Sequence, residues 1–334
     1  MLKKIIDKTF LFIGIILFVI VFKSIFGDNN SLVGVAVIIE VLVLMGENLI
    51  PKAGTNFIRL LIINVLLGVG AFIASQYILL GIVINFIVLT LIGYFCTYNL
   101  NRTLTVPFGL LYLFMLYTPV EGSELVKRYL ALAVGAICIM AMQFLINRKN
   151  NKVNVKESKL LYYLEDKTVW KAYKIWGKDI HINTIRLKYG VRIGILVAIT
   201  AFIVYYFNLR EGRWLSYTVF SLTELYADNC RIRSKQRLEG TLIGVAIVII
   251  LFIFIKNVAL RGLIVLIFGY ANSFTDNYRD DMICVTASVV ASMALTNSTI
   301  FAAIERIIYV VAGIVIALIA NHFLFHVKSK ESIT

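Results

Sequence analysis

Long apolar runs recur along this chain, and they restrict what it can fold into more than any other feature. The runs at 10–26 and 307–325 each approach the roughly 20 apolar residues that an α-helix needs to cross a bilayer. The chain of 334 residues is 60% hydrophobic and only 16% charged, whereas a soluble domain is about half apolar and a quarter charged. The sequence therefore predicts an all-α integral membrane protein.

Twelve apolar segments can be delimited, six on each side of a polar interval. They span about 9–26, 32–49, 57–75, 78–96, 104–117, 125–146, 189–207, 213–228, 237–255, 259–272, 282–296 and 303–325. The segments at 104–117 and 282–296 are short. We expect that they are broken, that they do not fully span, or that the bilayer thins around them.

Lysine and arginine are distributed unevenly between the two sets of loops that twelve spans would create. One side receives the N-terminal lysines, the interval at 147–187, the loop with Arg231 and Arg233, and the C-terminal lysines. Because cytoplasmic loops carry an excess of these residues, we expect both termini in the cytoplasm, in a bacterial inner membrane. The same bias explains the net charge of +14, which in a soluble protein would suggest nucleic acid, so no nucleic-acid partner is predicted.

The two halves of the chain show signs of an internal duplication. Arg59 and Arg237 each open a predicted segment, and so do Arg128 and Arg306; both pairs are 178 residues apart. Glycines and polar residues match in the same ungapped register, for example Gly135 with Gly313. Since each half holds an even number of spans, both copies enter the membrane the same way. The sequence predicts two parallel six-helix repeats.

A basic interval separates the two predicted repeats. The expected organisation is a first repeat at 1–147, a cytoplasmic connector at 148–187, a second repeat at 188–327 and a cytoplasmic tail at 328–334. Apolar residues between Leu160 and Trp176 could form one face of an amphipathic helix on the anionic inner leaflet. The alternative is a solvated connector.

Carboxylates in apolar segments are the clearest candidates for function. Glu40 lies near the middle of the second segment, where a charge costs about 2.5–3.5 kcal/mol even on insertion scales. Glu47 follows on the same predicted face, and the equivalent helix of the second half carries Tyr217, Ser221 and Glu224. These residues could line a transport pathway in which Glu40 or Glu224 couples proton entry to export. Glu40 is expected to carry a proton because burial of an unpaired acid favours its neutral form. The alternative is hydrogen bonding between helices.

The stretch "RLEGTLIGV" places a charge beside small residues at the start of a predicted span. Gly240 and Gly244 lie on one helix face, where small residues allow close helix contact in lipid, and Thr241 can bond a backbone carbonyl. This is a good structural explanation of the motif. The functional alternative is that Arg237, together with Arg59, attracts an anion at the inner mouth of a pathway, aided by a helix N-terminus.

Residues 210–245 resemble the fusaric acid resistance-like family of membrane proteins. The pattern of that family is a Trp after a helix hairpin, a second hydrophobic helix, and an Arg followed closely by Gly-Thr-x-x-Gly. The corresponding residues are Trp214, Arg237, Gly240, Thr241 and Gly244. The family is grouped with aromatic acid exporters and, more remotely, with plant malate channels. The resemblance implies transport of organic anions.

Motifs for enzymatic chemistry are missing from the sequence. It has no G-x-x-x-x-G-K-[ST], H-E-x-x-H or G-x-S-x-G, and its four cysteines fit no metal spacing. We therefore expect a protein that is not an enzyme and needs no cofactor or metal. The expected partners are a small organic anion and membrane lipid, and a homo-oligomer is left open. Three hypotheses stand: an exporter of organic, aromatic anions that is coupled to protons, a passive anion channel, and a membrane scaffold.

Overall fold

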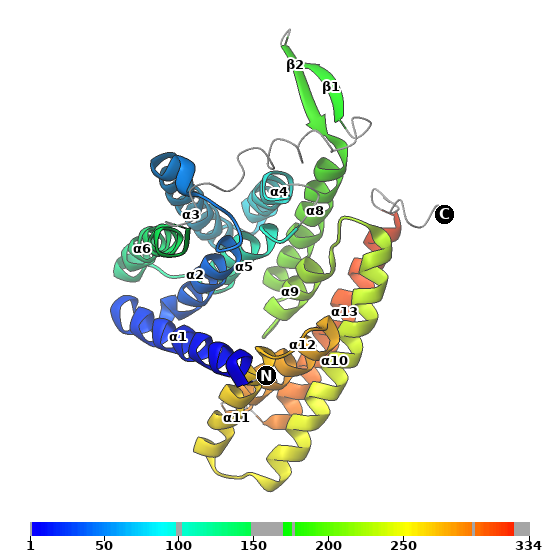
Figure 1. The fold of residues 1–334 in the computed structure, drawn as a ribbon. Helices are drawn as coiled ribbons and strands as arrows, with labels where there is room; N and C mark the ends of the chain where they lie inside the picture. Colours follow the sequence, from blue (N-terminus) through cyan, green and yellow to red (C-terminus); the bar gives the residue numbers. More distant parts are fainter. Residues whose placement is uncertain (1, 98–101, 148–169, 176–177, 296–297, 324–334) are drawn as a thin grey trace. The chain divides into compact units, whose positions relative to one another are not determined.

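The computed structural model describes residues 2–97, 102–147, 170–175, 178–295 and 298–323, and most of them are helical (Figure 1). The twelve α-helices within these described residues correspond one to one with the twelve predicted segments. Their bounds are α1 (Leu2–Phe26), α2 (Ser31–Leu44), α3 (Ala53–Gln76), α4 (Ile78–Phe95), α5 (Thr105–Tyr117), α6 (Gly122–Asn147), α8 (Thr184–Tyr206), α9 (Arg213–Leu222), α10 (Ala227–Phe254), α11 (Val258–Asn272), α12 (Tyr278–Met293) and α13 (Thr299–Phe323). Two short 3-10 helices, η1 (Asp28–Asn30) and η2 (Ile50–Lys52), precede α2 and α3.

Seven helical stretches in the described part of the chain are long and apolar enough to cross a membrane. They are Ile5–Phe26, Ile50–Gln76, Ile78–Phe95, Gly122–Ile146, Thr184–Tyr206, Asp228–Phe254 and Thr299–Phe323. The prediction of a helical, multi-pass membrane protein is thus confirmed. The predicted short segments are indeed short, since α5 has 13 residues and α12 has 16, but α2, α9 and α11 are also shorter than a full span.

The end of the connector forms a β-hairpin. Strand β1 (Trp170–Ile175) pairs antiparallel with β2 (Lys178–Asn183). The predicted amphipathic helix is therefore wrong for these residues, and the chain is not purely α. Ile180 and Ile182 alternate with polar residues, which is the period of a strand rather than a helix. The rest of the connector and the predicted tail at 328–334 lie outside the described residues.

The chain divides into two compact units, which are described separately. The N-terminal unit comprises Leu17–Phe202, and the C-terminal unit comprises Met1–Ile16 together with Ile203–Thr334.

In the N-terminal unit, the short helix α5 lies at the centre. Helices α2, α3 and α4 pack against it, and α6 packs against α2 and α3. Leu111, Leu113 and Leu116 of α5 are fully buried. A helix that is apolar all round is normally enclosed by protein, so α5 does not need the length of a lipid-facing span.

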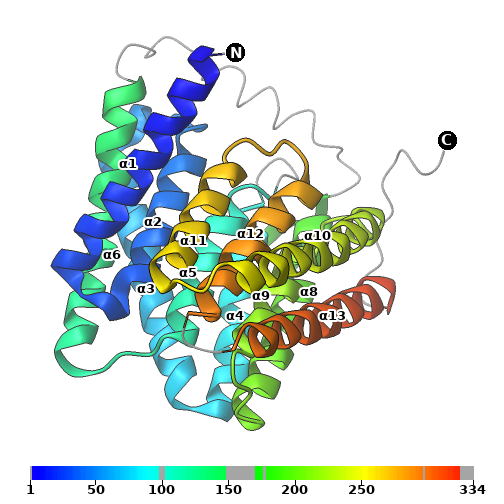
Figure 2. The same ribbon diagram turned by 90° about the horizontal axis from the view of Figure 1, so that it is seen from below.

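In the C-terminal unit, α10 is the central helix. It packs against α12 and α13, while α11 packs on α12 and α9 on α13. Helices α10 and α13 run side by side in opposite directions (Figures 1 and 2). The apolar core between α10, α12 and α13 includes Val245, Val248, Ala287, Val290 and Ala302.

Candidate functional site

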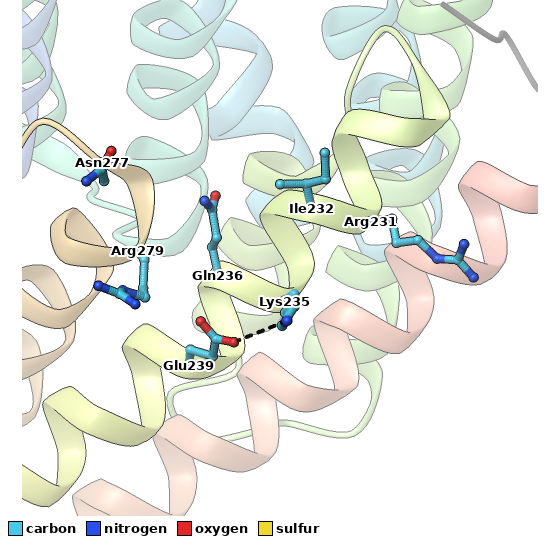
Figure 3. A pocket seen from close by; sticks show the side chains of 7 residues that line it. All are labelled: Arg231, Ile232, Lys235, Gln236, Glu239, Asn277 and Arg279. Carbon is cyan, nitrogen blue, oxygen red and sulfur yellow. Dashed lines mark ion pairs between the residues drawn. The ribbon is translucent and has the colours of Figure 1, made fainter. Parts of the chain in front are cut away.

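The first half of α10 carries an open pocket of about 750 Å³ on the surface of the C-terminal unit. Its lining comes from α10 and from the start of α12, and consists of Arg231, Ile232, Lys235, Gln236, Glu239, Asn277 and Arg279. Figure 3 shows Gln236 and Glu239 of α10 beside Arg279 of α12. The lining residues include three cations and one acid. The 3.9 Å pair between Lys235 and Glu239 is largely exposed and therefore weak, and Nε of Arg279 lies 3.1 Å from Oδ1 of Asp280. The pocket is positive and attracts anions.

Arg237 points inward from the same stretch of α10. Its side chain is buried, and Nη1 donates to the hydroxyl of Tyr278 at 3.2 Å and to Sδ of Met282 at 2.8 Å. Ser221 of α9 shares the Tyr278 hydroxyl at 3.0 Å. Within the described ranges, no carboxylate pairs with Arg237. The site therefore joins α9, α10 and α12 around a guanidinium whose charge is not neutralised.

The predicted position of Arg237 at a helix start is wrong. Helix α10 begins at Ala227, so the N-terminus of the helix lies about 15 Å away along its axis. The helix dipole acts within the first turn and does not reach Arg237. The start was misplaced because residues 227–236 are too polar to be counted in an apolar segment.

Glu224 is engaged in an ion pair rather than lying free in a pathway. Its Oε1 is 3.0 Å from Nε of Arg233, and the Arg233 guanidinium stacks 3.9 Å from the ring centroid of Tyr278. The predicted series Tyr217, Ser221 and Glu224 is only partly helical, because α9 ends at Leu222. Tyr217 is buried, and its ring meets Trp214 edge-on at 5.4 Å.

Arg306 of α13 is the residue of this cluster that sequence reasoning missed. It was assigned only to the repeat, yet it is fully buried, and its guanidinium carbon lies 4.2 Å from the ring centroid of Trp214. It is also within electrostatic range of Arg237 and Tyr278. An arginine seven residues inside an apolar span was the signal that could have found it.

Gly240, Thr241 and Gly244 hold α10 close to α12. A Cβ at Gly240 would lie 2.7 Å from the carbonyl oxygen of Arg279, and one at Gly244 would lie 2.7 Å from that of Ile283. Thr241 donates to the carbonyl of Arg237 at 2.8 Å. These distances support the packing explanation of this motif.

The remaining predicted residues lie in the N-terminal unit. Glu40 of α2 is fully buried; its Oε2 accepts from Nδ2 of Asn64 on α3 at 3.3 Å, while Oε1 has no hydrogen-bond partner among the described residues. Glu47 is exposed and is not on the face of Glu40, because α2 ends at Leu44. Arg59 is exposed on α3.

The fold and this site define a multi-pass helical membrane protein with buried cationic side chains in its C-terminal unit. Residues 197–320 match the family described as fusaric acid resistance protein-like, which confirms for this part of the chain the resemblance seen in the sequence. The match contains Trp214, Arg237 and Arg306. The searches of curated proteins and of solved structures found no match. Among the residues that the structure describes, no three His, Cys, Asp or Glu side chains gather as metal ligands would.

Proposed function

We propose that this protein is a secondary transporter that exports organic anions, with aromatic carboxylates as the class that the site suits best. The observation that carries the proposal is Arg237, a buried guanidinium without a carboxylate partner in the described part of the chain, on the helix that also lines a basic pocket. A guanidinium can bind a carboxylate through two parallel hydrogen bonds. The nearby rings of Tyr278 and Trp214 suit a planar aromatic group. The matched family, which suggests a membrane transporter, supports the same function.

We further propose that the two halves are parallel six-helix repeats. Equivalent helices make equivalent contacts within each unit: α2 packs on α6 as α9 packs on α13, and α3 packs on α5 and α6 as α10 packs on α12 and α13. Gly135 of α6 meets Val37 of α2, and Gly313 of α13 meets Thr218 and the carbonyl of Leu215 on α9. A duplication accounts for these matched contacts.

Energy coupling is assigned to Glu40 in this proposal. A buried carboxylate with one oxygen unpaired can take up and release a proton as the protein changes conformation. A proton gradient across a bacterial inner membrane, with both termini of the protein in the cytoplasm, would then drive export of the anion.

Flux through proteoliposomes tests the proposal. Purified protein should accumulate radiolabelled benzoate, the simplest aromatic carboxylate, against its gradient when a pH gradient is imposed. Arg237→Gln should remove this activity, whereas Lys52→Gln, which deletes one exposed charge, should not. Flux that only follows the benzoate gradient would indicate a passive channel. Absence of any anion flux, with a protein or anionic lipid retained on purification, would overturn the proposal in favour of a scaffold.

A further inference from the structure

Arg306 is a fully buried arginine whose side chain has no acceptor in the described part of the chain. Its Nε, Nη1 and Nη2 atoms all lack a hydrogen-bond partner among the residues that the structure describes. Burying a charge without a partner is strongly unfavourable. The stacking on Trp214 offsets part of this penalty but supplies no hydrogen-bond acceptor. The five N–H donors of this guanidinium are therefore available to a ligand.

The depth of Arg306 in the bundle increases the penalty. Helix α13 runs antiparallel to α10, and Nδ2 of Asn321 lies 3.1 Å from Sγ of Cys230. Arg306 comes fifteen residues before Asn321, so it lies level with about position 245, near the middle of α10. Arg306 also lies within the candidate span Thr299–Phe323, and a charge inside a span is costly and usually functional.

A cation and a phenol are the electrostatic neighbours of Arg306, and the carboxylate described in contact with Trp214 is that of Glu211, which accepts from Nε1 of Trp214 at 3.2 Å. Arg237 and Tyr278 are the groups that interact with it electrostatically, and Arg237 repels it. One turn along α9 from Trp214, the hydroxyl of Thr218 is also buried and has no hydrogen-bond partner among the described residues, where α9 packs on Gly313 of α13. This environment disfavours a second cation and favours an anion with a flat apolar part.

Arg128, at the equivalent position 178 residues earlier, shows that the fold can satisfy such an arginine. Arg128 donates to the carbonyl of Thr118 at 2.6 Å, to that of Asn29 at 2.9 Å and to Oδ1 of Asn30 at 2.8 Å. These acceptors at helix ends make it a structural residue. The absence of comparable acceptors around Arg306 distinguishes the two arginines.

We propose that Arg306 binds the carboxylate of the transported anion together with Arg237, and that the aromatic ring of the anion lies against Trp214. The proposal rests on the proposed function and adds the position of the anion and the need for an aromatic ring. Because Arg306 is fully enclosed, the anion reaches it only after α9 or α13 moves, as in a transporter with alternating access.

Trp214 provides a direct measure of binding, since the chain has only three tryptophans and the other two, Trp170 and Trp176, lie in the connector. Full-length protein with both replaced by Phe, purified in detergent, is titrated with benzoate while Trp214 fluorescence is recorded. We expect a saturable change with benzoate and none with benzamide, which has the same ring without the charge. Arg306→Gln should weaken benzoate binding by about tenfold or more. The benzoate affinity of Arg306→Lys should lie between those of the parent and Arg306→Gln, because lysine keeps the charge but lacks the bidentate geometry.

Thermal unfolding distinguishes a variant that has lost benzoate binding from one that has lost its fold. Benzoate should raise the Tm of the parent but not of Arg306→Gln. Without benzoate, Arg306→Gln should leave the Tm unchanged or raise it, because it removes an uncompensated buried charge. The matched variant Arg128→Gln should lower the Tm and keep the benzoate affinity of the parent.

Three outcomes would overturn this inference. The first is parent-like benzoate affinity in Arg306→Gln; the second is transport of benzoate by a parent whose Trp214 fluorescence and Tm do not respond to it. Both leave the proposed function intact. The third is a pair of results: Arg306→Gln fails to fold, and Arg306→Lys binds benzoate as tightly as the parent. Together they would make Arg306 a structural residue. If the parent protein neither binds nor transports benzoate, both proposals are wrong.

Discussion

Arg237 of α10 and Tyr278 of α12 are joined by a hydrogen bond of 3.2 Å from Nη1 to the phenol oxygen. The same oxygen lies 3.0 Å from Oγ of Ser221 on α9. One partly buried phenol therefore connects three helices through the two described side chains within hydrogen-bond distance of its hydroxyl. It also places the ring under the guanidinium of Arg233, which is paired with Glu224.

Tyr278→Phe should destabilise the protein by about 1–3 kcal/mol, because it removes both hydrogen bonds and leaves Arg237 with the weak acceptor Sδ of Met282. Thermal unfolding in detergent measures the effect. Tyr309→Phe is the matched control: its hydroxyl donates to the carbonyl of Arg210 at an exposed site, where water replaces the lost bond. Equal stability of the two variants would show that the Tyr278 hydroxyl does not hold the helices together.

Gly244→Ala should cost about 1–3 kcal/mol, because the added Cβ would lie 2.7 Å from the carbonyl oxygen of Ile283 and 3.0 Å from Cβ of Thr286. Gly262→Ala is the control on α11, where an added Cβ meets nothing within 4 Å. The control should be neutral or stabilising by up to about 1 kcal/mol, since alanine favours the helix. Unfolding temperatures that fall equally in both variants would contradict a tight contact between α10 and α12.

Glu40→Gln keeps the acceptor for Asn64 but removes the titratable group. We expect it to fold and insert, to lose accumulation of benzoate driven by a pH gradient, and to retain exchange of benzoate across the membrane. Proteoliposome uptake with and without the gradient measures both activities. Glu121→Gln, at an exposed position before α6, is the control. A normal rate with a normal pH dependence in Glu40→Gln would limit Glu40 to a structural hydrogen bond.

The topology can be tested with two cysteines in a chain whose four native cysteines are replaced. Lys174→Cys in β1 and Ser123→Cys at the start of α6 are both at exposed positions. The distribution of Lys and Arg predicts that the first lies in the cytoplasm and the second outside. A membrane-impermeant maleimide added to intact cells should label only Ser123→Cys. Labelling of both from outside would refute the predicted orientation.

Properties that depend on local sequence were predicted well. Apolar length and composition located all twelve helices and identified a membrane protein, because a helix satisfies its own backbone wherever it lies in the bilayer. The Gly-Thr-x-x-Gly pattern located the close contact of α10, since only small residues permit it. The sequence analysis did not predict the β-hairpin, although Ile180 and Ile182 alternate with polar residues, because the apolar residues between Leu160 and Trp176 also fit one face of a helix.

Tertiary structure decided which polar side chains matter. In sequence, Arg128 and Arg306 occupy the same place in matched segments, and nothing local separates them. Folding brings Thr118, Asn29 and Asn30 to Arg128, whereas it brings Trp214 to Arg306 and leaves its nitrogens without acceptors in the described part of the chain. The environment of a buried charge depends on residues far away in the chain. The sequence by itself therefore determined where the helices form and that they belong in a membrane. Only the packing of those helices produced the cationic site.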